Sequence, residues 1–293
     1  MSLCTLCPRA CGADRDVSRG FCGAARNPNV ARAALHFWEE PFISGTRGSG
    51  TIFFCGCNLD CVFCQNRAIN HTRIGPELDA GALALVMLSL QAKGAHNVNL
   101  VSPAPFVPML REAIPRARGM GLRIPVVYNT NAYEKAEAVG SLSGLIDVYL
   151  PDLKYVSSPI AAKYSGAADY FAFASRAVDE MVAQCGMLEL NAEGMAVKGV
   201  VLRHLVLPGS VDETRRVVDY VADHFPPDIA FSLMGQYVPN GRELPAPLDR
   251  RLLRREYDRA VNYALQRGLN RVLIQKLSSA SLDFTPEFDG SSA

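Results

Sequence analysis

Three cysteines stand in a C-x3-C-x2-C spacing at Cys57, Cys61 and Cys64. They follow directly after the apolar run Thr51–Phe54, so we expect them at the end of a strand. Three thiolates at this spacing can bind one corner of a small iron–sulfur cluster. Because a 4Fe–4S cube normally takes four thiolates, three would leave one iron open to another kind of ligand. The loop therefore predicts a 4Fe–4S site with an open iron.

The composition favours a large, folded chain without a strongly charged partner. Its 293 residues are 49% hydrophobic and 20% charged, enough for one large domain, or one domain and a small appendage. A net charge of +1 gives no field that would attract nucleic acid. No signal peptide opens the chain, and the apolar run near 80–90 is shorter than the ~18 residues of a membrane span. We expect a cytoplasmic protein without nucleic-acid or membrane partners.

The other cysteines gather near the start of the chain. Eight of the nine lie within the first 64 residues, and four of these form Cys4-x2-Cys7-x3-Cys11-x10-Cys22. A disulfide framework suits short secreted domains, so clustered cysteines here are better read as reduced metal ligands. Four thiolates predict a closed second site for zinc or for a second iron–sulfur cluster, and the spacing does not choose between the two metals.

The remainder alternates between apolar, β-branched runs and helical patterns. This pattern predicts an α/β fold with parallel strands, arranged as a partial (β/α)6-type barrel with a small cysteine-rich N-terminal extension. The expected segments are a metal-binding stretch at 1–28, a connector at 29–50, the partial barrel at 51–283 and a loose tail at 284–293. The expected strands are 51–54, 97–101, 124–130, 145–150, 200–207 and 229–234, with a further short run at 272–275.

Polar residues follow the predicted strands, where the chemistry of barrels of this kind gathers. Asn66 comes just after the third cysteine of the loop and can form hydrogen bonds near a cluster. Later strands end in Ser102, Asn129, Thr130, Asp152, Lys154 and Arg203. Strand alternation places His204 on the face opposite Arg203, so we expect only Arg203 to face the site. Cys55 is interpreted as a strand cysteine rather than a fourth ligand.

The cysteine loop and its surroundings resemble the radical S-adenosylmethionine (SAM) superfamily. Within it, Asp152-x-Lys154 and the N-terminal cysteines are most similar to a branch related to pyruvate formate-lyase activating enzyme. The resemblance implies that the open iron holds SAM and that Phe63 lies against its adenine. It also implies a monovalent cation held by Asn129, Thr130 and Asp152. Ser102 stands where many members have Gly-Gly-Glu, and Arg203 is expected to bind the cofactor carboxylate or an acid in the barrel.

The implied reaction is reductive cleavage of SAM to methionine and a 5′-deoxyadenosyl radical, which abstracts hydrogen from a substrate. The substrate stays open between a protein, a nucleotide and a small molecule, with a glycine Cα of a partner enzyme as one candidate. A reductase or a flavodoxin-type protein is the expected electron donor. Two alternatives remain: a non-enzymatic iron–sulfur electron carrier or scaffold, and a binding protein whose cysteines all hold zinc.

Overall fold

A nine-stranded, mostly parallel sheet forms the centre of the computed structural model, which describes residues 3–239, 243–275, 277 and 285–291. The strands follow the order β1-β2-β3-β4-β5-β7-β8-β9, with β6 beside β7. The strands are β1 (Val30–His36), β2 (Ser49–Phe54), β3 (Val98–Val101), β4 (Val126–Thr130), β5 (Val148–Pro151), β6 (Glu189–Leu190), β7 (Ala196–Leu205), β8 (Ala230–Met234) and β9 (Val272–Ile274).

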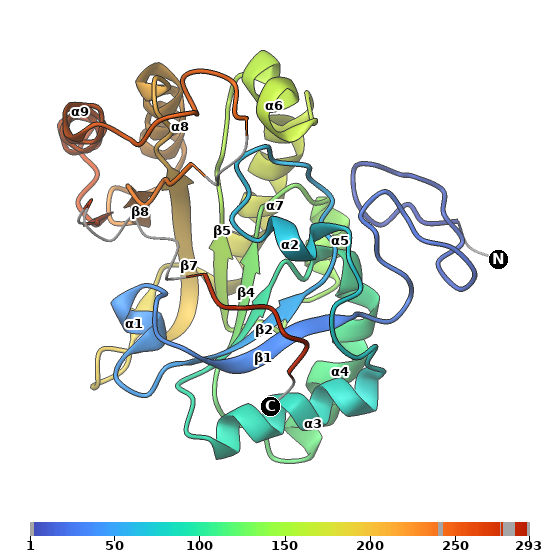
Figure 1. Ribbon diagram of the computed structural model, residues 1–293. Helices are drawn as coiled ribbons and strands as arrows, with labels where there is room; N and C mark the ends of the chain where they lie inside the picture. Colours follow the sequence, from blue (N-terminus) through green and yellow to red (C-terminus); the bar gives the residue numbers. More distant parts are fainter. Residues whose placement is uncertain (1–2, 240–242, 276, 278–284, 292–293) are drawn as a thin grey trace.

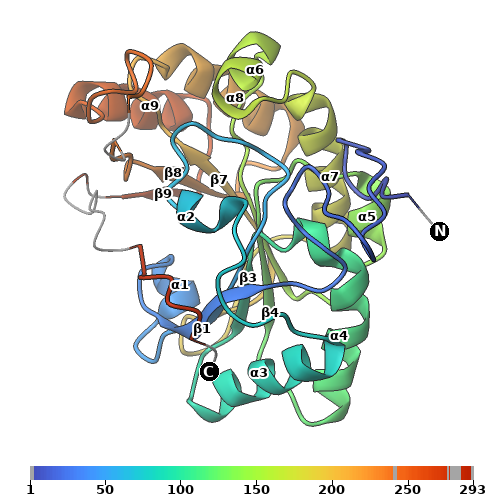
Figure 2. The ribbon, with the colours of Figure 1, turned by 45° about the vertical axis from the view of Figure 1, so that its right-hand side comes forward.

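The long helices alternate with these strands and lie around the outside of the curved sheet (Figures 1 and 2). The helices are α1 (Pro41–Ser44), α2 (Arg67–Asn70), α3 (Ala80–Ala92), the 3₁₀ turn η1 (Ala104–Phe106), α4 (Val107–Gly119), α5 (Ala136–Gly140), α6 (Ser158–Ser165), α7 (Tyr170–Cys185), α8 (Val211–His224) and α9 (Arg254–Gln266). In the described part of the chain, none of them combines the length and apolar character needed to cross a membrane.

The parallel strands confirm the predicted partial barrel. From β2 to β9 along the main path, every neighbouring pair is parallel. The strands are buried along most of their length, as expected when helices cover the outer face of a parallel sheet. The two ends of the path, β1 and β9, are not paired with each other, so the barrel is open. The carboxyl ends of the parallel strands meet at one edge.

Residues 29–50 are more than the predicted connector. They contain β1, which pairs antiparallel with β2 from Val30 opposite Phe54 to His36 opposite Ser49. Helix α1 follows and begins at Pro41, a residue well suited to a first helical position because its missing amide would have no partner there. Ile43 of α1 is fully buried against the apolar side chains of β4, β5 and β7. The connector therefore adds a strand to the sheet and closes one side of its interior.

The described part of the predicted loose tail is bound to the sheet. The Ala33 amide of β1 donates to the Ser291 carbonyl at 2.9 Å, and the Gly290 amide donates to the Ala31 carbonyl at 2.9 Å. Phe288 packs edge-on against Phe53, with 5.4 Å between ring centroids. The prediction of a loose tail over 284–293 is wrong for 285–291, because these residues cover the free edge of β1. Residues 284, 292 and 293 lie outside the described residues.

Replacing Phe288 by Ala tests this attachment. We expect the free energy of unfolding to fall by about 1 kcal/mol, because a partly buried aromatic ring is removed. Amide exchange at Ala33 should accelerate as its hydrogen bond to Ser291 opens more often. Glu287→Ala is the matched control, because this exposed residue contributes only its carbonyl oxygen to Arg32. Unchanged exchange at Ala33 in Phe288→Ala would contradict the attachment.

Candidate active site

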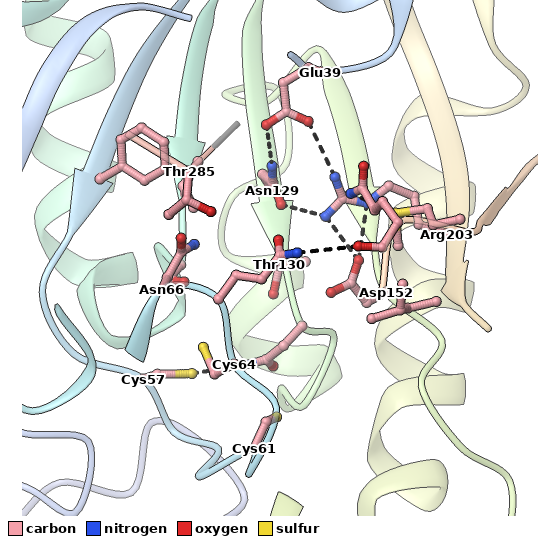
Figure 3. A pocket seen from close by; sticks show the side chains of 18 of the residues that line it. Glu39, Cys57, Cys61, Cys64, Asn66, Asn129, Thr130, Asp152, Arg203 and Thr285 are labelled. Carbon is pink, nitrogen blue, oxygen red and sulfur yellow. Dashed lines mark hydrogen bonds and ion pairs between the residues drawn. The ribbon is translucent and has the colours of Figure 1, made fainter. Parts of the chain in front are cut away.

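A cavity of about 240 Å³ opens at the carboxyl ends of the parallel strands. Its walls come from the cysteine loop after β2, from the ends of β3, β4, β5, β7 and β8, and from the segment after β1 (Figure 3). Every residue predicted for the main site lines it. These residues are Cys57, Cys61, Phe63, Cys64, Asn66, Ser102, Asn129, Thr130, Asp152, Lys154 and Arg203. The sheet therefore brings together side chains that are far apart in the sequence.

The three cysteines form one side of this cavity. The Asn131 side-chain amide donates to the Cys57 sulfur at 3.3 Å, and the Ser165 hydroxyl lies 3.0 Å from the Cys61 sulfur. Burial, and then the other two cysteines, raise the pKa of Cys57 to about 12. Burial and Cys61 likewise raise the pKa of Cys64 to about 11. All three thiols are buried and resist ionisation in the absence of a metal. A cationic metal centre would stabilise them as thiolates, so the three side chains are suited to bind one.

A group of charged side chains lies opposite the cysteines. The Arg203 guanidinium contacts Asp152 at 2.9 Å and Glu39 at 3.5 Å, and it donates to the side-chain oxygen of Asn129 at 2.6 Å. The second oxygen of Asp152 accepts from the Lys154 ammonium at 2.7 Å. Glu39 also accepts from the side-chain amide of Asn129 at 3.1 Å, which closes a ring of contacts drawn in Figure 3. We refer to Glu39, Asn129, Asp152, Lys154 and Arg203 as the charged group.

Mutual neutralisation keeps Asp152, Lys154 and Arg203 ionised. Burial alone would raise the pKa of Asp152, but Lys154 and Arg203 lower it below its ordinary value. Burial would lower the pKa of Lys154, yet Asp152 raises it well above its usual range. Their side chains are only 17% and 16% exposed, so each charge depends on its partner rather than on water. The group therefore presents fixed charges to the cavity at neutral pH.

The oxygens predicted to hold a monovalent cation contact protein groups instead. The Asn129 oxygen accepts from Arg203, and both oxygens of Asp152 face side-chain cations. The Thr130 hydroxyl donates to Glu134 and accepts from the Ala132 amide at 3.1 Å. A monovalent cation at these oxygens stays a prediction.

Ser102 and Phe63 also line the cavity. Ser102 has a φ of 58°, a left-handed conformation that is uncommon for a residue other than glycine and that often marks functional sites. Its amide donates to the Asn129 carbonyl at 3.1 Å. Phe63 packs edge-on against Tyr237, with 6.3 Å between centroids, and still lines the cavity. Their contacts with a cofactor stay a prediction.

Two further predictions concern residues outside the cavity. His204 points away from Arg203, and its ring nitrogens contact the Leu153 carbonyl at 2.6 Å and the Thr214 hydroxyl at 2.9 Å. Burial lowers the pKa of His204 to about 4, so the ring is neutral at physiological pH. Cys55 is buried, and its thiol donates to the Ile74 carbonyl at 3.4 Å. Neither residue lines the cavity.

Glu39 and Asn131 line the cavity and Glu40 lies beside it, although none of the three was predicted from the sequence. Glu39 enters the charged group from the segment after β1. Glu40 is buried beside it, where burial raises its pKa and Arg203 opposes that rise. In the sequence, Glu39 and Glu40 form a pair of acidic residues directly before Pro41, which could have indicated a site. The pair precedes the first parallel strand, whereas site residues were expected after the strands. Asn131 directly follows Thr130 and supports Cys57.

Comparison with protein families matches residues 51–246 to the model described as the radical SAM superfamily. This stretch covers more than half of the chain and includes the cysteine loop and most of the charged group. The chain belongs to the radical SAM superfamily. Membership implies a 4Fe–4S cluster and SAM as cofactors, and an enzyme that carries out SAM-dependent radical chemistry.

The chain is also similar to one protein in sequence and to several solved structures in fold. An uncharacterised protein of Methanocaldococcus jannaschii is 28% identical over 277 residues, covering 92% of this chain and 76% of that protein. The structure of anSMEcpe with bound AdoMet and a Kp18Cys peptide has a TM-score of 0.50 at 13% identity, covering 72% of this chain and 56% of that one. The structure of Streptococcus suis SuiB bound to S-adenosylmethionine has a TM-score of 0.49 at 16% identity, covering 76% of this chain and 49% of that one. This chain thus spans about half the length of these two structures.

The charged group of this radical SAM protein can be tested with Asp152→Asn. The change leaves two largely buried cations without their carboxylate, so we expect a loss of about 3 kcal/mol in the free energy of unfolding at neutral pH. Because the pKa of Asp152 is lowered in the fold, its contribution is present above the ordinary value of 3.8 and is lost as pH falls through the folded pKa. The difference from the wild type should therefore be largest at neutral pH and shrink below about pH 4.

Denaturant unfolding at several pH values measures this difference. Asp179→Asn is the matched control, because Asp179 forms a pair with His224 in which the two side chains are 44% and 48% exposed. We expect that exposed pair to contribute less than about 1 kcal/mol. An Asp152→Asn cost that is equally large at pH 7 and pH 3 would contradict the account.

Proposed function

We propose that this protein is a radical SAM enzyme that removes a hydrogen atom from a polypeptide substrate. The observation that supports this most directly is the single cavity lined both by Cys57, Cys61 and Cys64 and by the polar ends of the following strands. When a 4Fe–4S cluster and SAM are bound, they supply one-electron cleavage of the sulfonium bond and hence a 5′-deoxyadenosyl radical. The protein's own residues bind, orient and shield these groups.

The cysteine loop would hold the cluster through three thiolates. Asn131 donates to the Cys57 sulfur and also contacts the Asn58 side chain at 2.9 Å, which fixes its orientation. Ser165 lies between the Cys61 sulfur and the Tyr155 hydroxyl, 3.0 Å from each. Hydrogen bonds to ligand sulfurs influence the potential of an iron–sulfur cluster. Asn131 and Ser165 are therefore positioning residues for this site.

The charged group and the cavity walls would orient SAM. Lys154 lines the same cavity as Cys61 and Cys64, so we assign it to the carboxylate of SAM. Arg203 is already held by Asp152, Asn129 and Glu39, and we assign it a positioning role rather than direct binding. Ser102 and Asn66 offer polar groups to the amino group, and Phe63 offers an aromatic face to the adenine.

A second groove supports an extended substrate. It has a volume of about 170 Å³, runs beside β1, and shares His36, Trp38, Phe53 and Pro286 with the main cavity. The Trp38 side chain at its wall is 58% exposed. A polypeptide could lie along this groove and present one residue to the cavity, whereas a small molecule would need only the cavity itself. The sequence likeness to glycyl-radical activating enzymes agrees with a protein substrate.

Formation of 5′-deoxyadenosine tests the proposed chemistry. After anaerobic reconstitution, addition of SAM and a reductant should release 5′-deoxyadenosine, measured by liquid chromatography. Cys61→Ala should lose both cluster iron and product, because the remaining two thiolates cannot hold the cluster. Cys185→Ala is the matched control: Cys185 is buried in α7, outside the cavity, and should keep both.

An intact cluster that yields no 5′-deoxyadenosine would overturn the proposed function. If its electron paramagnetic resonance signal were also insensitive to SAM, the protein would instead be an electron carrier or scaffold. Purified protein that contains zinc and essentially no iron would exclude both the radical enzyme and the iron–sulfur carrier or scaffold.

A further inference from the structure

The part of the cavity across from the cysteines carries more acidic than basic side chains (Figure 3). Glu39 lines it, and Glu40, the next residue, is buried beside it. Both acids act on the charge of Arg203, together with Asp152. Lys154 forms its ion pair with Asp152. Three carboxyl groups therefore share two cations, and one carboxyl group has no cation of its own among the described residues.

Hydrogen-bond acceptors at this acidic end lack a donor. Asn99 is fully buried, and its side-chain amide donates to Glu39 at 3.2 Å. The side-chain oxygen of Asn99 has no hydrogen-bond partner in the described part of the chain. The second oxygen of Glu39 has the Arg203 guanidinium at 3.5 Å, which is long for a hydrogen bond. Buried polar atoms are rarely left unpaired, so these two oxygens indicate a missing donor.

Aromatic side chains join the acidic end to the groove beside β1. His36, Trp38 and Phe53 line both the groove and the main cavity, and Trp38 directly precedes Glu39 in the sequence. His36 packs edge-on against Phe53, with 5.8 Å between ring centroids. Burial and then Arg32 lower the pKa of His36 to about 4, so its ring is uncharged at neutral pH. A side chain that enters from the groove therefore meets uncharged aromatic walls.

We propose that Glu39 and Glu40 form a subsite for a lysine side chain of the polypeptide substrate. This inference rests on the proposed function, because it identifies the part of the polypeptide that enters the cavity. A lysine has an apolar stem that suits aromatic walls, and an ammonium that donates three hydrogen bonds and accepts none. Its charge would balance the excess carboxyl group, and its donors would serve the unpaired oxygens of Glu39 and Asn99.

Other side chains match these features less well. An arginine would bring a second planar guanidinium with five donors, whereas Arg203 already occupies Asp152 and the Asn129 oxygen. A neutral amide would add an acceptor of its own and leave the excess carboxyl group without a cation. An acidic side chain would add a fourth carboxylate to a buried site, which is costly. Lysine is the side chain whose charge, stem and donors all agree with the site.

Binding of n-butylammonium tests the subsite without a polypeptide, because this ion has the chain and the charge of a lysine side chain. Added to the reconstituted protein with SAM, n-butylammonium chloride should raise the melting temperature until the site is saturated, since a ligand of the folded state stabilises it. Glu39→Gln should lose this shift. Glu112→Gln is the matched control and should keep it, because Glu112 is exposed on α4 and lies outside the cavity.

Two further ligands and a second variant make this test specific. n-Butanol lacks the charge and potassium chloride lacks the apolar stem, so neither should reproduce the shift. If Glu39→Gln is unstable, Glu40→Gln serves instead, and we expect it to bind n-butylammonium about tenfold more weakly. An equal shift with potassium would assign the acids to a metal cation and overturn the proposal. A wild type that does not respond to n-butylammonium, or variants that respond like the wild type, would also overturn it.

Two pools of random decapeptides test the link to catalysis. One pool has lysine at a central position and the other has norleucine there, which keeps the apolar chain and lacks the ammonium. We expect the lysine pool to raise 5′-deoxyadenosine formation above the peptide-free rate about tenfold more than the norleucine pool, the contribution of one charged hydrogen bond. Equal rates with the two pools would overturn the lysine subsite. An intact cluster without any 5′-deoxyadenosine would count against the proposed function, and the n-butylammonium titration would still decide the subsite.

Discussion

The buried charge of Arg203 is the interaction on which the site depends. Its side chain is 9% exposed, and a guanidinium at this depth is costly unless acids and hydrogen-bond acceptors surround it. The structure supplies Asp152 from the end of β5, Asn129 from β4 and Glu39 from the segment after β1. The requirement to neutralise one arginine therefore fixes four separate parts of the chain relative to one another.

Tyr170 connects the charged group to the cysteine loop. Its hydroxyl accepts from the Lys154 amide at 3.0 Å and donates to the Asn131 carbonyl, 2.9 Å away. Asn131 in turn holds the Cys57 sulfur through its side chain. The position of the charges is thus coupled to the position of the thiolates by a short series of hydrogen bonds. A site built in this way is preorganised before any cofactor binds.

Most of the barrel and the main site could be predicted from the sequence, because the relevant signals are local. Apolar runs alternate with helical patterns, and parallel strands must bring their polar carboxyl ends to one edge. Ser102, Asn129, Asp152 and Arg203 were found for this reason. The likeness of the cysteine loop to a known family then added the cofactors, which no periodicity could supply.

The residues that escaped prediction depend on contacts between distant segments. Glu39 reaches the site because β1 pairs antiparallel with β2, and that pairing is not encoded in a strand–helix alternation. The attachment of 285–291 to β1 likewise joins opposite ends of the chain. The hydrogen bond from the Cys57 amide to the Cys22 carbonyl depends on the left-handed conformation of Gly56. The presence of a glycine in the sequence does not predict that conformation. These features follow from tertiary packing.

The most direct test of the central claim is whether SAM binds the iron left open by Cys57, Cys61 and Cys64. Electron–nuclear double resonance on the reduced protein, with SAM carrying a ¹⁵N-labelled amino group, measures the coupling of that nitrogen to the cluster. The account predicts a coupling typical of a directly bonded nitrogen, which disappears in Cys61→Ala together with the cluster. An intact, reduced catalytic cluster without nitrogen coupling would contradict the account.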